Sequence, residues 1–279
     1  MGPSGPSERG VMGPSGPSER GMIVAFDQAV ELSRRSLVAL IRQPQTWAPA
    51  LIFPLLLSAV YSAQFGRTIS QPGFPPVDSF LDFLLPAAIL QAVAFNATNG
   101  GSDLAHDIET GFYDRLIASP VSRVSIIVGR LAGSAAFALV QAVVLLAIFV
   151  GFGAQVKGGL GGAFVVIGVA VLLALAIGGL AVTLAMKTGS QEAVMATFPL
   201  IFVMLFISSA FFPTSTMKGW YKQLALCNPV TWIIDATRRL VIEGFSWSDA
   251  GRALGISAAF AVGAIALAFA AQRRRLRAH

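Results

Sequence analysis

The sequence SDLAHDIETGFYDRLIASPVSR, residues 102–123, is the one long stretch in the middle of the chain that a lipid bilayer would not accept. It carries seven Asp, Glu, His and Arg side chains, with Gly111 and Pro120 between them, and long apolar segments lie on both sides. A charged side chain at the bilayer centre costs about 2.5–3.5 kcal/mol on insertion scales. The stretch is therefore predicted to lie at or beyond one membrane face.

The composition is that of an integral membrane protein. Hydrophobic residues make up 55% and charged residues 12% of the 279 residues, and the mean hydropathy is +0.71. Soluble domains carry about 25% charged residues. The net charge of +6 comes largely from clusters beside apolar segments, which indicates membrane orientation and anionic headgroups, not nucleic-acid binding. The single cysteine, Cys227, excludes an intrachain disulfide and a multi-cysteine metal site.

Six apolar segments are long enough for a membrane-spanning helix, which needs about 20 residues. We predict an all-α integral membrane protein whose transmembrane domain covers residues 44–279, with spans at about 46–65, 80–101, 124–152, 161–186, 192–212 and 250–271. The second span is expected to end in a turn at Gly100-Gly101. Residues 213–249 are interrupted too often by Pro229 and by charged residues to face lipid. They are predicted to form a short re-entrant helical hairpin between spans five and six.

The chain before the first span divides into two parts. Residues 1–21 contain the sequence MGPSGPSERG twice and have little apolar surface to bury, so we predict a disordered repeated leader or tag. Residues 22–43 place apolar and basic residues on opposite faces at helical spacing, with Arg34 and Arg35 on the polar face. This pattern predicts a cytosolic amphipathic helix at the membrane interface; the alternative is the solvated start of span one. Lys and Arg counts of eleven inside against seven outside favour cytosolic N and C termini.

The sequence contains no site that would supply energy. It has neither a GxxxxGK[ST] phosphate loop nor a GxGxxG motif. The predicted spans have almost no ionisable residue in their central turns, where ion-coupled carriers place one, and a channel filter is missing. A membrane-embedded enzyme would need clustered His, Asp or Glu, and the one such cluster is 103–115. We therefore predict a protein that is not an enzyme and that handles a substrate in the membrane without a motor of its own.

The stretch also resembles a known signature. Glu109-Thr110-Gly111, Asp114-Arg115-Leu116 and Ser119-Pro120-Val121-Ser122-Arg123 resemble the E-x-G…(E/D)-R-L…(T/S)-P-x-x-R motif of ABC-2 type transporter permeases. A second match is Phe212-Pro213, Trp220, Asn228-Pro229 and Thr231 before the last span. The chain is most similar to the daunorubicin/doxorubicin-resistance type of drug exporter permease. It departs from the family at Lys218-Gly219, where many members have a proline, and at His106-Asp107, where an arginine often precedes the glutamate.

The resemblance implies the membrane-spanning permease subunit of an ATP-binding-cassette exporter in the plasma membrane of a bacterium. It implies no cofactor in this chain, ATP and Mg being bound by two copies of a separate ATP-binding subunit. The other implied partners are a second permease, identical or homologous, membrane lipid, and an amphiphilic or lipophilic substrate such as a drug, lipid or glycolipid. The residues expected to couple the chain to the ATPase are Glu109, Gly111, Asp114, Arg115, Pro120, Arg123, Arg34 and Arg35.

Candidate substrate contacts lie on two spans. Gln91, Phe95 and Asn99 share one face of span two, with Asn96 close by, and Phe198, Phe202 and Phe206 form a stripe on span five. Polar amides also hold helices together, and aromatic stripes also serve packing, so both readings stay open. The alternative functions are a polysaccharide or glycoconjugate exporter of the same family and a membrane-embedded enzyme.

Overall fold

The computed structural model of the protein describes residues 44–119 and 122–278. The predicted leader (1–21), the predicted interfacial helix (22–43) with Arg34 and Arg35, and Pro120 lie outside the described residues. Within those residues the regular secondary structure is helical. The elements are α2 (Pro44–Phe65), η1 (Gly66–Ser70), α3 (Phe80–Ala97), α4 (Asn99–Glu109), α5 (Phe112–Ala118), α6 (Arg123–Gly151), α7 (Gly159–Thr188), α8 (Gln191–Met195), α9 (Phe198–Ile207), α10 (Gly219–Cys227), α11 (Pro229–Ile242) and α12 (Trp247–Ala278).

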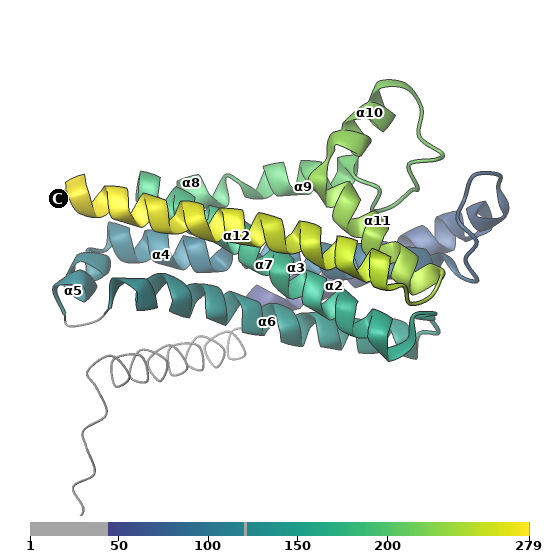
Figure 1. Ribbon diagram of the computed structural model, residues 1–279, viewed down its shortest axis with the longest axis horizontal. Coiled ribbons are helices and arrows are strands. Elements are labelled where there is room, and N and C mark those ends of the chain that lie inside the picture. The colour runs from purple at the N-terminus through teal and green to yellow at the C-terminus, as the bar shows by residue number, and fades with distance from the viewer. Residues whose placement is uncertain (1–43, 120–121, 279) are drawn as a thin grey trace, which may run out of the picture.

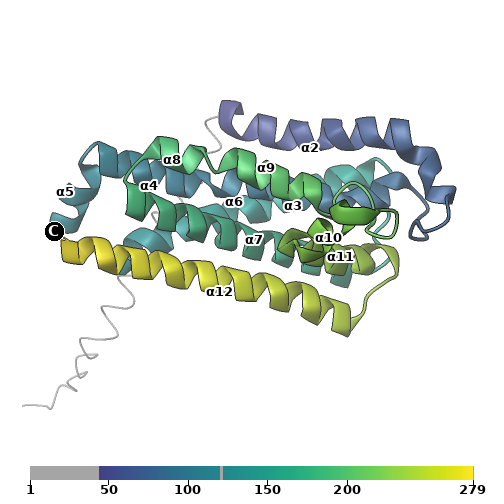
Figure 2. The same ribbon diagram turned by 90° about the horizontal axis from the view of Figure 1, so that it is seen from above.

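The long helices lie side by side in one elongated bundle (Figure 1). α2 runs along one edge and α12 along the opposite edge, with α3, α7 and α9 between them (Figure 2). α4, α5, α8 and the C-terminus gather at one end of the bundle, and α10 and α11 lie towards the other. α3 forms the buried centre, since side chains such as Phe83, Leu85 and Leu90 are fully buried.

Five of the six predicted spans are confirmed as helices long and apolar enough to cross a membrane. They are Ala48–Ser70, Phe80–Glu109, Val124–Gly151, Gly159–Thr188 and Trp247–Arg277. Each exceeds the roughly 20 residues that a crossing requires. The chain is therefore a multi-pass membrane protein.

The predicted span 192–212 is not confirmed as one helix. The chain forms α8 and α9 with a break at Ala196-Thr197, and α9 ends at Ile207. Together the two helices Gln191–Ile207 rise about 25 Å, which is less than the roughly 30 Å of a bilayer core. Pro199 explains the break, because proline has no N–H to bond the preceding turn. A sixth span therefore stays a prediction.

The predicted turn at Gly100-Gly101 is wrong. Both glycines are helical, and the chain runs from α3 into α4 with little interruption to Glu109. The glycines serve close packing, because a Cβ on Gly101 would lie 2.5 Å from the backbone of Ala181 on α7. The first part of the charged stretch, residues 102–109, therefore continues the helix that begins at Phe80 and does not form a loop.

Two helices do occupy the region predicted as a hairpin. Asn228 begins α11, where its side chain accepts a hydrogen bond from the Val230 N–H and Pro229 follows at the first helical position. α11 packs against α3 and α12 through buried residues such as Ile234 and Leu240. Entry of α10 and α11 into the membrane stays a prediction.

Candidate functional site

The charged stretch folds as two helices joined by a reversal at Gly111. Gly111 has φ +69°, a left-handed conformation that L side chains rarely adopt, and it turns the chain from α4 into α5 (Figure 1). Leu104 and Tyr113 are buried against residues of α6 and α7 such as Ile127 and Met186. The stretch therefore presents a polar face while its apolar side chains fix it to the bundle.

The signature glutamate contacts a distant part of the chain. The backbone N–H of Gln191 donates a hydrogen bond of 2.7 Å to the carboxylate of Glu109. Gly189, at φ +63°, ends α7 just before this point, and the Ser190 side chain accepts from the Ala193 N–H. Glu109 therefore satisfies a backbone donor at the start of α8 that the helix itself leaves unpaired.

A second link joins the same stretch to α6. Asp107 on α4 forms an ion pair with Arg130, and both side chains are only about one fifth exposed. Charged pairs of this kind are shorter and stronger than neutral hydrogen bonds. Together with Glu109, this pair ties the end of α4 to α6 on one side and to α8 on the other.

Two further predicted coupling residues, Asp114 and Arg115, lie on α5. Asp114 and Arg115 are exposed, and the Arg115 guanidinium lies 5.8 Å from the centre of the Phe112 ring, which is itself 48% exposed. Arg123 begins α6, although its side chain is outside the described set. The exposed face of α5, defined by Phe112, Asp114 and Arg115, is thus open to a partner.

The candidate polar residues of the second span make contacts between helices. The Asn96 amide donates to Gln141 on α6 at 3.2 Å, and the Asn99 amide donates to Asn96 at 3.3 Å. Gln91 is buried, and its amide nitrogen has no hydrogen-bond partner among the described residues. The Asn96–Gln141 contact joins two spans and fits the interpretation that such amides hold helices together, whereas the Asn99–Asn96 contact lies within one span. Lining of a pathway stays a prediction for all three residues.

The candidate aromatic residues, by contrast, meet in one continuous column. The ring of Phe95 on α3 lies 4.9 Å from Phe198 and 6.1 Å from Phe202, and Phe202 stacks on Phe206 at 4.3 Å. Five further rings extend this column at both ends and were not predicted from the sequence. They are Phe53, Tyr61, Phe65, Phe211 and Phe212, which come from α2 and from the segment after α9. The i,i+4 spacing of Tyr61 and Phe65 is the signal that could have shown two of them.

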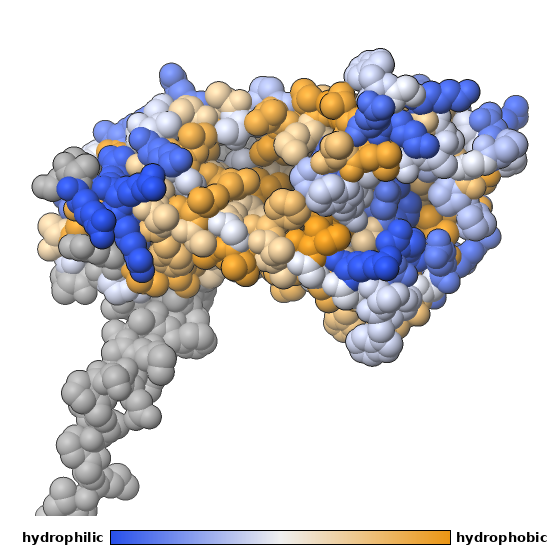
Figure 3. Space-filling model, turned by 45° about the horizontal axis from the view of Figure 1, so that its top comes forward, coloured by the Kyte–Doolittle hydropathy of each residue, from blue (hydrophilic) through white to orange (hydrophobic). Residues whose placement is uncertain are grey.

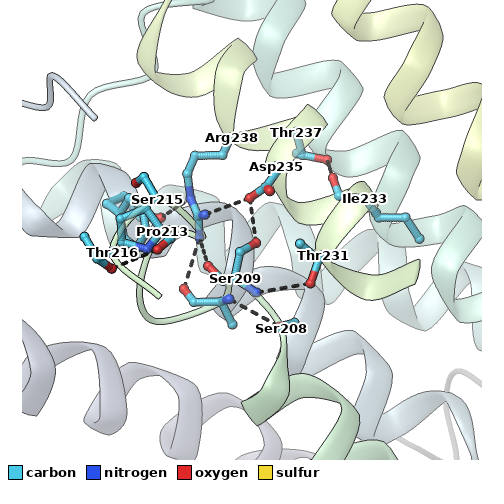
Figure 4. Close-up of polar contacts among 12 residues, drawn as sticks. Ser208, Ser209, Pro213, Ser215, Thr216, Thr231, Ile233, Asp235, Thr237 and Arg238 are labelled. Atoms are coloured by element: carbon cyan, nitrogen blue, oxygen red, sulfur yellow. Dashed lines mark hydrogen bonds and ion pairs between the residues drawn. The ribbon is translucent and has the colours of Figure 1, made fainter. Parts of the chain in front are cut away.

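The chain leaves helical geometry after α9, and Arg238 of α11 binds this segment (Figure 4). Its guanidinium donates to the carbonyl oxygens of Ser209 (2.8 Å), Ala210 (3.0 Å) and Phe83 (3.1 Å). It also pairs with Asp235 at 3.2 Å. Burial lowers the pKa of Arg238 to about 10, with Asp235 acting in the opposite direction, so the side chain stays protonated at neutral pH.

This network explains how non-helical backbone can be buried here. Ser209 and Ala210 are fully buried, and irregular backbone in a membrane protein requires protein partners for its polar groups. Arg238 supplies them and faces the Phe83 ring at 3.7 Å. This role of Arg238 was not predicted from the sequence, where Asp235 three residues earlier was the available signal. No group of three or more His, Cys, Asp or Glu that could hold a metal ion occurs in the part of the chain that the structure describes.

Comparisons with known proteins agree with these features. A family model described as ABC-2 type transporter matches residues 27–242, which is more than half of the chain. The "Daunorubicin resistance ABC transporter permease protein DrrB1" of Streptomyces coeruleorubidus is 25% identical over 229 residues, covering 80% of this chain and 78% of that protein. The "Probable doxorubicin resistance ABC transporter permease protein DrrC" of Mycobacterium tuberculosis H37Rv is 27% identical over 195 residues, covering 70% of each chain.

Proposed function

This chain belongs to the ABC-2 type transporter family, and on that premise we propose that it exports amphiphilic or lipophilic compounds across a bacterial plasma membrane. Its place in an ATP-binding-cassette exporter is that of the membrane subunit. In this proposal both termini lie in the cytosol, so that α4, α5 and α8 form the cytosolic end. Relatives named for daunorubicin and doxorubicin resistance support this substrate class.

The observation that carries the proposal is the physical continuity between the signature stretch and the aromatic column. Glu109 holds the first residue of α8, and α8 leads directly into α9, which carries Phe198, Phe202 and Phe206. A displacement of the Glu109 end would therefore move the helix that supplies three rings of the column. A membrane subunit that is driven by a separate ATPase needs such a connection to pass the motion to its substrate path.

The force would come from two copies of an ATP-binding subunit that bind ATP and Mg. The exposed face of α5 offers Asp114 and Arg115 for charge-assisted hydrogen bonds with such a partner, beside the exposed Phe112 ring. A second permease, identical or homologous, would complete the assembly. In this proposal the chain itself binds no cofactor and performs no catalysis.

The column suits a substrate with a flat apolar body. Aromatic rings pair at centroid separations of about 4.5–7 Å, and most successive rings of the column are already spaced in this range. The amides of Asn96 and Gln141 lie beside a cavity of about 50 Å³, which is also lined by Asn99 and Asp103. A polar group on the substrate could bind there while its apolar part follows the rings.

The proposal is tested by reconstitution. The full chain is co-expressed with the ATP-binding subunit that co-purifies with it, and uptake of fluorescent daunorubicin is measured in inside-out proteoliposomes with and without ATP. The expected result is ATP-dependent uptake together with substrate-stimulated ATP hydrolysis. Uptake that persists in vesicles lacking the ATP-binding subunit would refute the proposal. Hydrolysis stimulated by a polysaccharide carrier lipid and not by amphiphilic drugs would move the function to the glycoconjugate branch of the family.

A further inference from the structure

An apolar groove runs along the bundle beside α9. The aromatic rings of α2 lie on another side of that helix. The walls of the groove are α7 and α9, three residues of α11 (Pro229, Val230 and Ile233) line it as well, and Phe260 of α12 lies on its rim. Its floor includes Ala94 of α3, and its volume is about 410 Å³. Figure 2 shows α9, α7 and α12 next to one another in that order. Three residues on its rim stay open to the surroundings, since Leu180 is 52%, Leu200 60% and Phe260 41% exposed.

The length of the groove matches one leaflet of a bilayer. On α7 its lining runs from Leu173 to Leu184, which corresponds to a rise of about 16 Å. Half of a typical hydrocarbon core is about 15 Å. Because α7 and α12 are confirmed as helices able to span a membrane, the groove faces a solvent of acyl chains. The only polar side chains among the described residues that line it, Thr98 and Thr197, already donate to backbone carbonyl oxygens, so water would find few partners in it.

One end of the groove is basic. The α7 face that lines it continues from Leu180 and Leu184 to Lys187, and the α12 face continues in steps of seven from Phe260 through Leu267 to Arg274. The two helices keep this register, because Gly179 packs on Ala264 and the Arg275 guanidinium donates to the Met186 carbonyl at 3.1 Å. Lys187 and Arg274 are both exposed, and this register places them at the same end of the two helices, beyond the end of the groove that Leu184 lines.

The charge balance at this end is positive. The ends of α7 and α12 carry five cations, which are Lys187, Arg273, Arg274, Arg275 and Arg277. α8 contributes one carboxylate, Glu192, and the nearby Glu109 is already bonded to Gln191. Among the described residues no ion pair joins Lys187 or Arg274 to an acidic side chain. Figure 3 shows hydrophilic residues at both ends of the molecule and an apolar band between them.

We propose that this groove is a binding site for one anionic phospholipid. An acyl chain lies between α7, α9 and α12, and the phosphate headgroup binds Lys187 and Arg274. An apolar chain and a negative headgroup at one end fit the two features that the structure places together. The lipid would lie against α9 on the side away from the rings of α2 and would support that helix, so the site is distinct from the proposed substrate path.

The test measures lipid binding to the full-length chain, purified and delipidated in dodecyl maltoside, by native mass spectrometry. The probes are dioleoylphosphatidylglycerol and, with the same chains but no net charge, dioleoylphosphatidylcholine. We expect one tightly retained phosphatidylglycerol per chain. K187Q/R274Q should weaken its affinity about 30-fold, since each cation near a membrane surface contributes about a fivefold attraction to anionic lipid. K218Q/R252Q removes two exposed charges at the other end and should change nothing.

A second variant tests the apolar part of the site. L180W fills the groove from its open rim and should weaken the binding of both lipids; L200W repeats the test from α9 should L180W not fold, as judged by size-exclusion chromatography and circular dichroism. Equal affinity for the two lipids, or unchanged binding in K187Q/R274Q or in the groove-filling variants, would overturn the proposal. Loss of self-association in L180W with lipid binding intact would assign the groove to a second copy of the chain and would also overturn it. Neither readout involves ATP or transport, so the result is independent of the proposed export function.

Discussion

The Gln191 backbone nitrogen lies 2.7 Å from the Glu109 carboxylate, although 82 residues separate the two in sequence. Glu109 ends α4, within the signature stretch, and Gln191 begins α8, which leads to the aromatic residues of α9. The signature glutamate is thus an internal link between two elements as well as a candidate contact for a partner.

Replacing Glu109 is expected to uncouple ATP hydrolysis from transport. E109A leaves the Gln191 N–H without its charged acceptor, and E109Q keeps an acceptor but removes the charge. Hydrogen bonds to charged groups contribute about 1.5–3 kcal/mol; since this one is exposed, we expect roughly a tenfold loss of substrate moved per ATP in E109A and a smaller loss in E109Q. Both variants should still co-purify with the ATP-binding subunit. E192Q, which removes an exposed charge from α8, is the matched control, and loss of co-purification in E109A would instead make Glu109 a direct partner contact.

For the exposed face of α5 we expect the opposite effect, which is weaker binding of the ATP-binding subunit. The side chains of Asp114 and Arg115 make no hydrogen bond or ion pair with the described residues; Arg115 contacts only the Phe112 ring. D114R reverses one charge there without breaking a side-chain contact inside the chain. Because Asp114 lies in the first turn of α5, the reversal should cost the isolated subunit no more than about 1 kcal/mol of stability. We expect its co-purification with the ATP-binding subunit to fall at least several-fold. A stable D114R chain that retains the ATP-binding subunit in full would exclude this face as the docking surface.

Gly101 is predicted to be the position of α4 least tolerant of a side chain. A Cβ would lie 2.5 Å from the backbone and side chain of Ala181, so G101A must push α4 away from α7. Overpacking of this kind costs about 1–3 kcal/mol. Gly151, which ends α6 and would place a Cβ in open space, is the control, and G151A should be neutral or slightly stabilising. Thermal unfolding of both variants in detergent checks the difference; equal midpoints would show that α4 and α7 are not in close contact.

The sequence predicts the long elements of this fold well because their signal is local. Apolar length alone found α2, α6, α7, α12 and the span that α3 forms with α4, since each of these spans is longer and more apolar than a bilayer requires. The same rule placed the end of span two wrongly at Gly100-Gly101, because the glycines there reflect the approach of Ala181 on another helix. Spacing also placed Phe198, Phe202 and Phe206 on one face; in the structure Phe202 stacks on Phe206, and Phe198 and Phe202 both contact Phe95.

What the sequence could not show depends on contacts between distant segments. From the sequence alone, Arg238 is one more charge outside the apolar spans. Its role becomes visible only in the structure, where it donates to the carbonyl oxygens of Ser209, Ala210 and Phe83. The sequence shows 192–212 as one apolar run, because a proline such as Pro199 is tolerated in membrane helices. The end of the helix at Ile207 is visible only in the structure. The partner of Glu109 could not be predicted either, because it is a backbone N–H, which every residue except proline carries.

Arg238 is predicted to be essential for folding. Its side chain is 4% exposed and satisfies carbonyl oxygens on the non-helical segment after α9 and on α3. R238M keeps the apolar bulk but leaves these carbonyl oxygens unpaired, and each buried acceptor without a partner costs about 1–3 kcal/mol. Asp235 is one-third exposed and still accepts a hydrogen bond from the Ser209 hydroxyl. R238K should not restore stability, because one ammonium group cannot reproduce the planar set of donors. R252M, at an exposed position, serves as the control in thermal unfolding, and an R238M chain as stable as wild type would contradict the assigned role.

Phe202 is expected to contact substrate because its ring lies in the middle of the column, between Phe95 at 6.1 Å and Phe206 at 4.3 Å. Aromatic pairs contribute about 0.5–1.5 kcal/mol beyond the area they bury, so losing the ring should raise the KM for daunorubicin about two- to tenfold. F202L retains apolar volume and F202A does not, which separates recognition from packing. If the ring recognises substrate, both variants raise the KM, whereas V203A, at the exposed neighbouring position, leaves it unchanged. If the ring only packs, F202L transports like wild type and the loss in F202A follows its lower thermal stability.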